Sequence, residues 1–188
     1  MKRRVVMGAV LAVLLGLGAL LVLVPPPFMH PARKAQWQRS ECKAYLKAWL
    51  TAARDYRLEH DVYVTSPAKV GFSPERGNRN AYLAGPGPLE DRSTERLVGT
   101  AQAVGIGVDT ARRPNKRVRL EQVPADVVRR LGVSGACPAC ELTVACVAQL
   151  DEDEGVDIWT LSSGDRPGPE GTIVHAGEFI HELDDLPD

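Results

Sequence analysis

The chain has 188 residues, 44% hydrophobic but only 5% aromatic, and a formal net charge of −1 at pH 7. Residues 1–34 carry five bases and no acid, so the remainder holds 18 bases against 24 acids. An acidic outer part argues against nucleic acid as the main partner. The basic cluster within residues 112–119 is interpreted as a solvated loop or a docking surface. The length suits a membrane segment followed by one ordinary soluble domain.

The N-terminus predicts a membrane anchor. Three bases at residues 2–4 precede an uncharged, mostly apolar run at 5–24, which as a helix rises about 30 Å, the hydrocarbon thickness of a bilayer. The proline-rich stretch 25–31 offers no small-residue cleavage site. We expect a cytoplasmic tip at 1–4, a transmembrane helix at 5–24, a joint at 25–31 and a periplasmic domain at 32–188, single-pass in the inner membrane. A cleaved signal peptide is the alternative.

The stretch 32–60 is predicted to be an amphipathic helix. Its apolar residues recur at helical spacing on one face: Cys42, Tyr45, Leu46, Trp49, Ala52, Ala53 and Tyr56. Charged residues take the other face: Lys43, Lys47, Arg54 and Arg57. The rest of the chain must therefore cover one apolar stripe. Trp37, nearer the membrane, is interpreted as an interfacial anchor.

Beyond this helix the pattern changes to short strands. Strands are expected at 81–83, at an edge position within 104–108, at 142–150, at 156–162 and at 172–174, with a short helix at 124–131. The turn 151–155 joins two of these strands as a hairpin. A helix followed by strands, without strand–helix–strand alternation, predicts an α+β domain whose antiparallel sheet packs on the long N-terminal helix.

The four cysteines of an exported domain indicate disulfides, and three pairings exist. We expect Cys42–Cys146, because each lies on the apolar face of its element, and Cys137–Cys140, which are neighbours in sequence. A redox pair at Cys137 and Cys140 is the alternative, although such pairs open a helix and this one precedes a strand-like run. Zinc binding would need a second close pair, which Cys42 and Cys146 do not form.

Other chemical motifs are weaker. Asp151, Asp153 and Asp157 are calcium candidates because their oxygens alternate along the chain, but the glycine and glutamate of a calcium loop are replaced by Val156 and Ser162. A solvated turn is favoured over a metal site. The four histidines show no ligand spacing. We expect no catalytic residue, no cofactor and no small-molecule substrate.

Several stretches together resemble one family. Residues 40–48 read SECKAYLKA and residues 72–79 read FSPERGNR, and shorter matches are GPLEDRS at 87–93, GVSGACPAC at 132–140 and DIWTLSS at 157–163. The chain resembles the type IV pilins of Gram-negative bacteria. The resemblance implies a long N-terminal helix on a small antiparallel sheet, and other pilin or pilus-assembly proteins as partners.

The PERGNR loop is the most specific part of this resemblance. It consists of Pro74, Glu75, Arg76, Gly77, Asn78 and Arg79. Its proline, glycine and asparagine predict a fixed turn. We expect this turn next to the C-terminal end of the long helix, with Gly77 at positive φ.

The chain departs from the family at its N-terminus. Pilins of this family open with a basic leader, a glycine, a phenylalanine or methionine, and a glutamate. Here Ala9 follows Gly8, Val13 stands where the glutamate would be, and the first acid is Glu41. We therefore expect an intact N-terminus in the inner membrane and little incorporation as a self-assembling major pilin. The leading hypothesis is a non-enzymatic, membrane-anchored, pilin-like structural or interaction protein of the cell envelope, an atypical or minor component associated with a type IV pilus system. The alternative is a tethered redox or metal-binding module.

Overall fold

The computed structural model describes residues 31–151 and 153–185. The chain divides between Gln36 and Trp37 into two units, which are described separately. Of the first unit, residues 31–36 form the beginning of helix α2. The predicted membrane segment 5–24 lies outside the described residues. Within the described ranges, no helix combines the length and the apolar character needed to cross a bilayer.

Helix α2 spans Pro31–His60 and confirms the predicted helix. Proline suits a first helical position, and neither glycine nor proline interrupts the following residues. The helix ends where Asp61 adopts φ 58° and its N–H bonds the carbonyl of Arg57 at 2.8 Å. Arg57 and His60 lie in the last turn, where positive charge suits the helix dipole.

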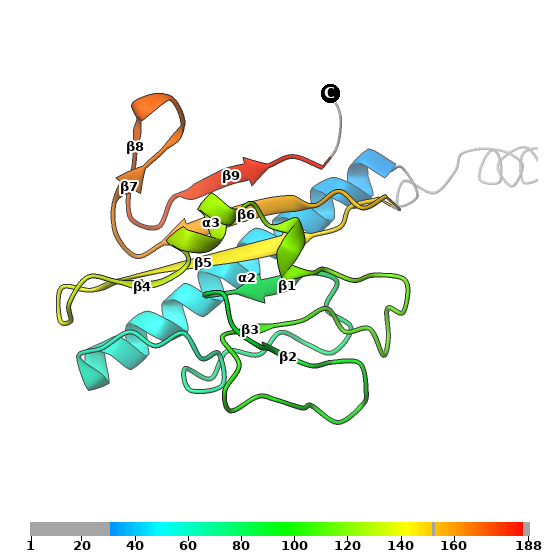
Figure 1. The fold of residues 1–188 in the computed structure, drawn as a ribbon, viewed down its shortest axis with the longest axis horizontal. Coiled ribbons are helices and arrows are strands. Elements are labelled where there is room, and N and C mark those ends of the chain that lie inside the picture. The colour runs from blue at the N-terminus through cyan, green and yellow to red at the C-terminus, as the bar shows by residue number, and fades with distance from the viewer. Residues whose placement is uncertain (1–30, 152, 186–188) are drawn as a thin grey trace, which may run out of the picture. The chain divides into compact units, whose positions relative to one another are not determined.

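The main sheet contains seven strands. They are β1 (Ala81–Leu83), β2 (Leu89–Glu90), β3 (Gly105–Ile106), β4 (Gly132–Ser134), β5 (Glu141–Ala148), β6 (Asp157–Ser162) and β9 (Phe179–Leu183). Their order is β2-β3-β1-β5-β6-β9, and β4 pairs with β5 (Figure 1). The predicted strands at 81–83, 142–150 and 156–162 are confirmed.

The sheet is mixed, so the prediction of a purely antiparallel sheet is wrong at one edge. β2 and β3 pair in parallel, because the long connection between them returns the chain to the end from which β2 started. The expected edge position of the strand within 104–108 is also wrong, since β2 lies outside β3. The predicted strand at 172–174 forms β8 (Ile173–Val174), which pairs with β7 (Arg166–Pro167) in a separate two-stranded sheet.

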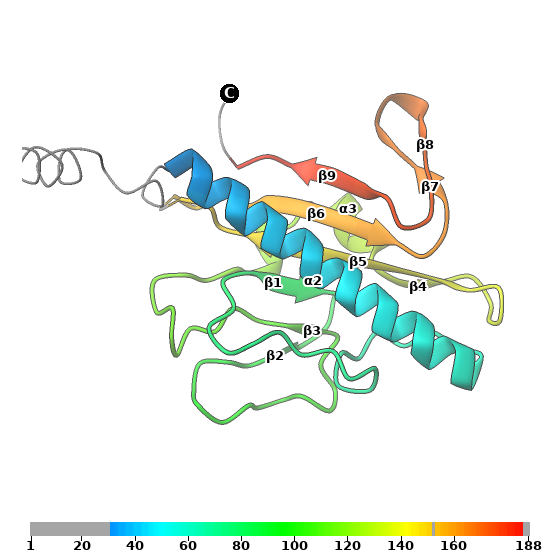
Figure 2. The same cartoon turned by 180° about the vertical axis from the view of Figure 1, so that it is seen from behind.

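Helix α2 covers one face of the main sheet (Figure 2). Cys42, Leu46, Trp49 and Ala53 are completely buried there. They belong to one apolar cluster with sheet residues such as Tyr82, Val144, Cys146 and Leu161. The Trp49 ring stacks on Phe72, with 5.0 Å between ring centroids. The predicted stripe is thus the buried face.

A second layer covers the opposite face of the sheet, which the sequence analysis did not expect. It consists of α3 (Ala125–Arg130) and the 3-10 helix η2 (Leu120–Gln122) (Figure 1). Residues of this layer and of the sheet form one apolar cluster: Leu83, Val123, Val127, Leu131, Ala145, Val147, Val156 and Ile158. The predicted short helix is confirmed as α3. Both faces of β5 are therefore buried.

Two disulfides join the four cysteines, Cys42–Cys146 and Cys137–Cys140. The first links α2 to β5, with 5.8 Å between the Cα atoms and a sequence separation of 104. The second closes the short loop before β5. This is the pairing expected from the apolar faces, and no cysteine is free.

We predict unequal effects of removing the two disulfides. In the chain-entropy model, closing a loop of about 100 residues stabilises by about 4.7 kcal/mol, against about 2 kcal/mol for a loop of four. Cys146→Ala should therefore lower the free energy of unfolding much more than Cys140→Ala. Denaturant titration of the full-length chain in detergent measures both. Equal losses, or peptide mapping that links Cys42 to Cys137 or Cys140, would contradict the prediction.

Candidate functional site

The PERGNR loop is held by a buried carboxylate that lies far away in sequence. Arg76 grips Asp109 with two nitrogens, Nε to Oδ2 at 2.5 Å and Nη2 to Oδ1 at 3.0 Å. The N–H of Gly77 donates to the same carboxylate at 2.7 Å. Asp109 is fully buried. The hydrogen bond from Arg76, together with the backbone N–H groups of Gly77 and Arg112, holds the pKa of Asp109 below its usual range.

A second arginine fastens the other side of the loop. Arg92 is 1% exposed, and its Nη1 donates to the Pro74 carbonyl and to Asn78 Oδ1, both at 2.9 Å. Its Nε donates to Glu90 at 2.6 Å. Asn78 in turn donates to the carbonyl of Gly107 at 2.8 Å. The Nη2 of Arg92 donates to Ser73 Oγ at 3.0 Å. Each nitrogen of this buried guanidinium group thus donates at least one hydrogen bond, which offsets the cost of burying its charge.

The loop lies beside the first part of α2, so its predicted position at the C-terminal end of the helix is wrong. The guanidinium group of Arg79 lies 4.6 Å from the centre of the Trp37 ring. Burial lowers the pKa of Arg79, and burial raises the pKa of Glu41, one turn of helix after Trp37. The expectation failed because the position of the loop is set by hydrogen bonds to Arg92, Gly107 and Asp109, which follow β2 and β3. Its short distance in sequence from His60 does not decide where it lies. Glu75 remains exposed.

The positive φ expected for Gly77 is confirmed, at +92°. An added Cβ would meet only the Arg112 side chain, at 3.9 Å. The requirement for glycine is therefore conformational rather than steric.

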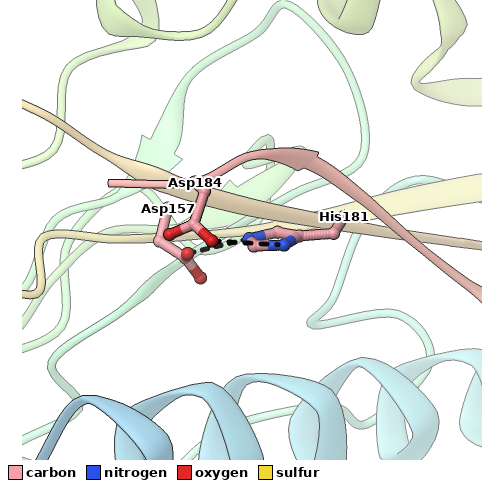
Figure 3. Close-up of side chains that lie close together, drawn as sticks. All are labelled: Asp157, His181 and Asp184. Carbon is pink, nitrogen blue, oxygen red and sulfur yellow. Dashed lines mark hydrogen bonds and ion pairs between the residues drawn. The ribbon is translucent and has the colours of Figure 1, made fainter. Parts of the chain in front are cut away.

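A charged cluster ties α2 to the far edge of the sheet. Asp157 at the start of β6, His181 on β9 and Asp184 after β9 converge there (Figure 3). His181 Nε2 lies 2.8 Å from Asp157 Oδ1, and Arg39 Nη2 lies 2.9 Å from the same oxygen. Arg39 also contacts Asp184. Trp159 Nε1 donates to the second oxygen of Asp157 at 2.7 Å.

This cluster is saturated rather than open. Asp157 is fully buried and is bonded on both oxygens. The His181 ring stacks on Trp159 with 3.9 Å between centroids, and the Lys43 ammonium lies 3.5 Å from the centre of the same Trp159 ring. A metal ion bound by these acids would have to displace Arg39. The arrangement is suited to fixing the helix on the sheet.

The structure separates the three calcium candidates. Asp151 and Asp153 lie with Asp185, their oxygens within 4.8 Å of one another, whereas Asp157 belongs to the Arg39 cluster. The expected grouping with Asp157 is therefore not formed, because that residue turns inward to meet α2. Leu150 N–H donates to Asp185 at 3.0 Å.

The Cys137–Cys140 pair leads into strand β5, not into a helix. It therefore lacks the helix N-terminus that lowers the pKa of a reactive thiol. This geometry is that of a structural loop closure.

Sequence reasoning missed several residues of these networks. The residues that form the key contacts received no role from the sequence: Arg39, Arg92, Asp109, His181 and Asp184. Arg92 falls within the stretch 87–93 that carried part of the resemblance, which was the one available signal. Nothing in the local sequence around Asp109 indicates that it is the partner of Arg76, since 33 residues separate them.

A long helix linked covalently to a small sheet, with the buried carboxylates of Asp109 and Asp157 each paired with an arginine, is the arrangement expected of a pilin domain. The family model for type IV pilin PilA matches residues 33–157, from α2 to the first residue of β6. The chain is also 28% identical over 178 residues to the "Type IV major pilin protein PilA" of Myxococcus xanthus strain DK1622. That alignment covers 86% of this chain and 80% of the relative. The chain belongs to the type IV pilin PilA family.

We predict that Asp109→Asn destabilises the protein by about 2 kcal/mol at neutral pH, since it weakens charge-assisted hydrogen bonds to a buried group. The pKa of Asp109 is lower in the folded than in the unfolded chain. Its stabilising contribution is therefore complete above the unfolded pKa and is lost as pH falls toward the folded pKa. The difference in unfolding free energy between parent and variant should shrink below about pH 4.

Denaturant titrations at neutral and acidic pH measure this difference. Asp55→Asn is the matched control, because Asp55 is exposed on α2. It should change stability by less than about 0.5 kcal/mol. An Asp109→Asn variant as stable as the control would contradict the role of Asp109.

We predict that Gly77→Val costs about 1 kcal/mol or more, because a β-branched residue resists positive φ. Gly77→Asn is the control and should cost less, since asparagine enters this region more readily. Thermal melting of the two variants compares them directly. If both melt like the parent, the loop is not held as tightly as its hydrogen bonds indicate.

Proposed function

We propose that this chain is a non-enzymatic structural subunit of a type IV pilus system. In this proposal residues 5–24 anchor it in the inner membrane, its folded domain faces the periplasm, and its partners are other pilin or pilus-assembly proteins. The observation that carries the proposal is the family match over residues 33–157, which includes α2 and strands β1 to β5. The likeness to a protein named as a major pilin supports a place within the filament.

The contacts of α2 suit a load-bearing subunit. A filament transmits force along its helices, so the domain must not slide along or peel from α2. Cys42–Cys146 crosses this interface covalently, and the Arg39 cluster and the Trp37–Arg79 contact flank it. Pulling the helix away would require breaking a covalent bond and exposing buried charges.

An atypical or minor role is the second candidate, and one feature of the sequence favours it. No acid occurs before Glu41. A subunit packed in a filament core would bury its N-terminal ammonium group, which costs several kcal/mol without a carboxylate partner. Copies of this chain would lack that carboxylate. This role predicts that the chain forms a small part of the filament.

The tethered redox or metal-binding module is not favoured. Cys137–Cys140 leads into a strand, and the Asp157 carboxylate is already bonded to Arg39, His181 and Trp159.

We predict that the chain is recovered in filaments sheared from its native cells. Mass spectrometry of the sheared material measures its share of total pilin, and intact-mass analysis of the membrane fraction reads its N-terminus. A major share supports the filament subunit, and a small share supports the minor role. Complete absence from sheared filaments, with normal amounts in the membrane, would contradict both.

A further inference from the structure

A groove opens at the C-terminal end of α2. It is lined by Arg54, Arg57, Leu58, Asp61, Tyr63, Pro138 and Ser163 and is called the arginine groove below. Leu58 is 83% exposed, so the groove also has an uncovered apolar wall.

The positive charge of the groove is not balanced. Arg54 forms no hydrogen bond or ion pair within the described parts of the chain. Arg57 donates to the Pro138 carbonyl at 2.5 Å and lies 5.0 Å from the centre of the Tyr63 ring, but neither group carries a charge. Asp61 is the single acid among the lining residues. Two guanidinium groups against one carboxylate leave a site for an anionic partner.

The turn between β5 and β6 carries the opposite charge. This acidic turn is defined by Asp151, Asp153 and Glu154. Burial raises the pKa of Asp185, and the nearby charges of Asp151 and Asp153 raise it further, which indicates crowded carboxylates. The Glu154 side chain is 92% exposed and lies 4.0 Å from Arg119. Lys116 contacts the backbone carbonyl of Asp151.

The groove and the acidic turn lie at opposite ends of the domain. Arg39 on α2 contacts Asp184, next to Asp185, and precedes Arg54 by about four turns of helix, or about 22 Å. Figures 1 and 2 both show the β4–β5 connection near the C-terminal end of α2. The two surfaces cannot meet within one chain.

We propose that the arginine groove of one copy binds the acidic turn of the next copy, head to tail. This inference rests on the proposed role as a filament subunit. Such a contact leaves a free groove at one end and a free acidic turn at the other. A contact between two different surfaces can therefore repeat into an open filament, whereas a two-fold contact closes on itself.

Charge exchange in the full-length chain tests the contact. Arg54→Glu places like charges together and should lower the fraction of the chain recovered in sheared filaments by about tenfold. Adding Glu154→Arg should restore that fraction. Arg129→Glu is the control, because Arg129 is exposed on α3 away from the groove, and it should leave assembly unchanged. Equal total amounts of chain in the cells show that folding is intact.

Two results of this experiment overturn the inference. The first is that Arg54→Glu assembles into filaments at the parental level. If that variant also loses binding to an anionic polysaccharide, the groove binds an external ligand instead of a second copy. The second is failure of the double exchange to restore assembly.

A cross-linking experiment separates this inference from the proposed function. If the parent chain is absent from filaments, the filament role fails. The contact between two copies can still be tested by cross-linking in native membranes. A carbodiimide should join the amine introduced by Arg54→Lys to a carboxylate of residues 151–154 in a second, isotope-labelled copy. The amide forms with net loss of water taken up by the carbodiimide. Arg129→Lys is the control, and absence of the residue 54 link overturns the proposed contact.

Discussion

The structure depends on the buried face of α2. Cys42, Leu46, Trp49 and Ala53 follow one another at intervals of three or four residues, and each is completely buried. Strands as short as those of this sheet do not hold together without a covering layer. The helix supplies that layer on one side, and the disulfide from Cys42 to Cys146 fixes which strand lies under which turn of the helix.

Apolar packing alone would leave the helix free to rotate or slide, because hydrophobic burial is not directional. Charged residues at the two margins of the stripe remove that freedom. Arg39 reaches Asp157 on one side, and Trp37 receives Arg79 from the PERGNR loop on the other. The loop is in turn held by Asp109 and Arg92, so the setting of the helix depends on contacts far apart in sequence.

The sequence predicted the elements whose signals are local. Three local patterns correspond to elements of the structure. They are the apolar stripe of α2, the alternation in residues 142–162 that forms β5 and β6, and the proline-to-glycine pattern of 124–132 that forms α3. The sequence did not predict β2, β4, β7 or β9, because these strands of two to five residues lack a clear local pattern and depend on pairing with their neighbours. The second apolar cluster was missed for a related reason. Ala145 and Val147 lie on the face of β5 opposite Cys146, and the layer that covers them includes Val123 and Val127, which are distant in sequence.

The partners of buried charges were also beyond sequence reasoning. Arg76 and Asp109 are 33 positions apart and meet only through the fold, so no spacing rule connects them. Within the domain such charges are paired, whereas Arg54 at the end of α2 is not. An exposed ion pair contributes at most about 1 kcal/mol, so charge at the ends of the domain cannot supply most of the association energy. Its effect is to reject wrong orientations and to set the register between copies. Apolar surface must supply the remaining association energy. The exposed Leu58 lies in the arginine groove itself, where an entering partner would bury it together with the charges.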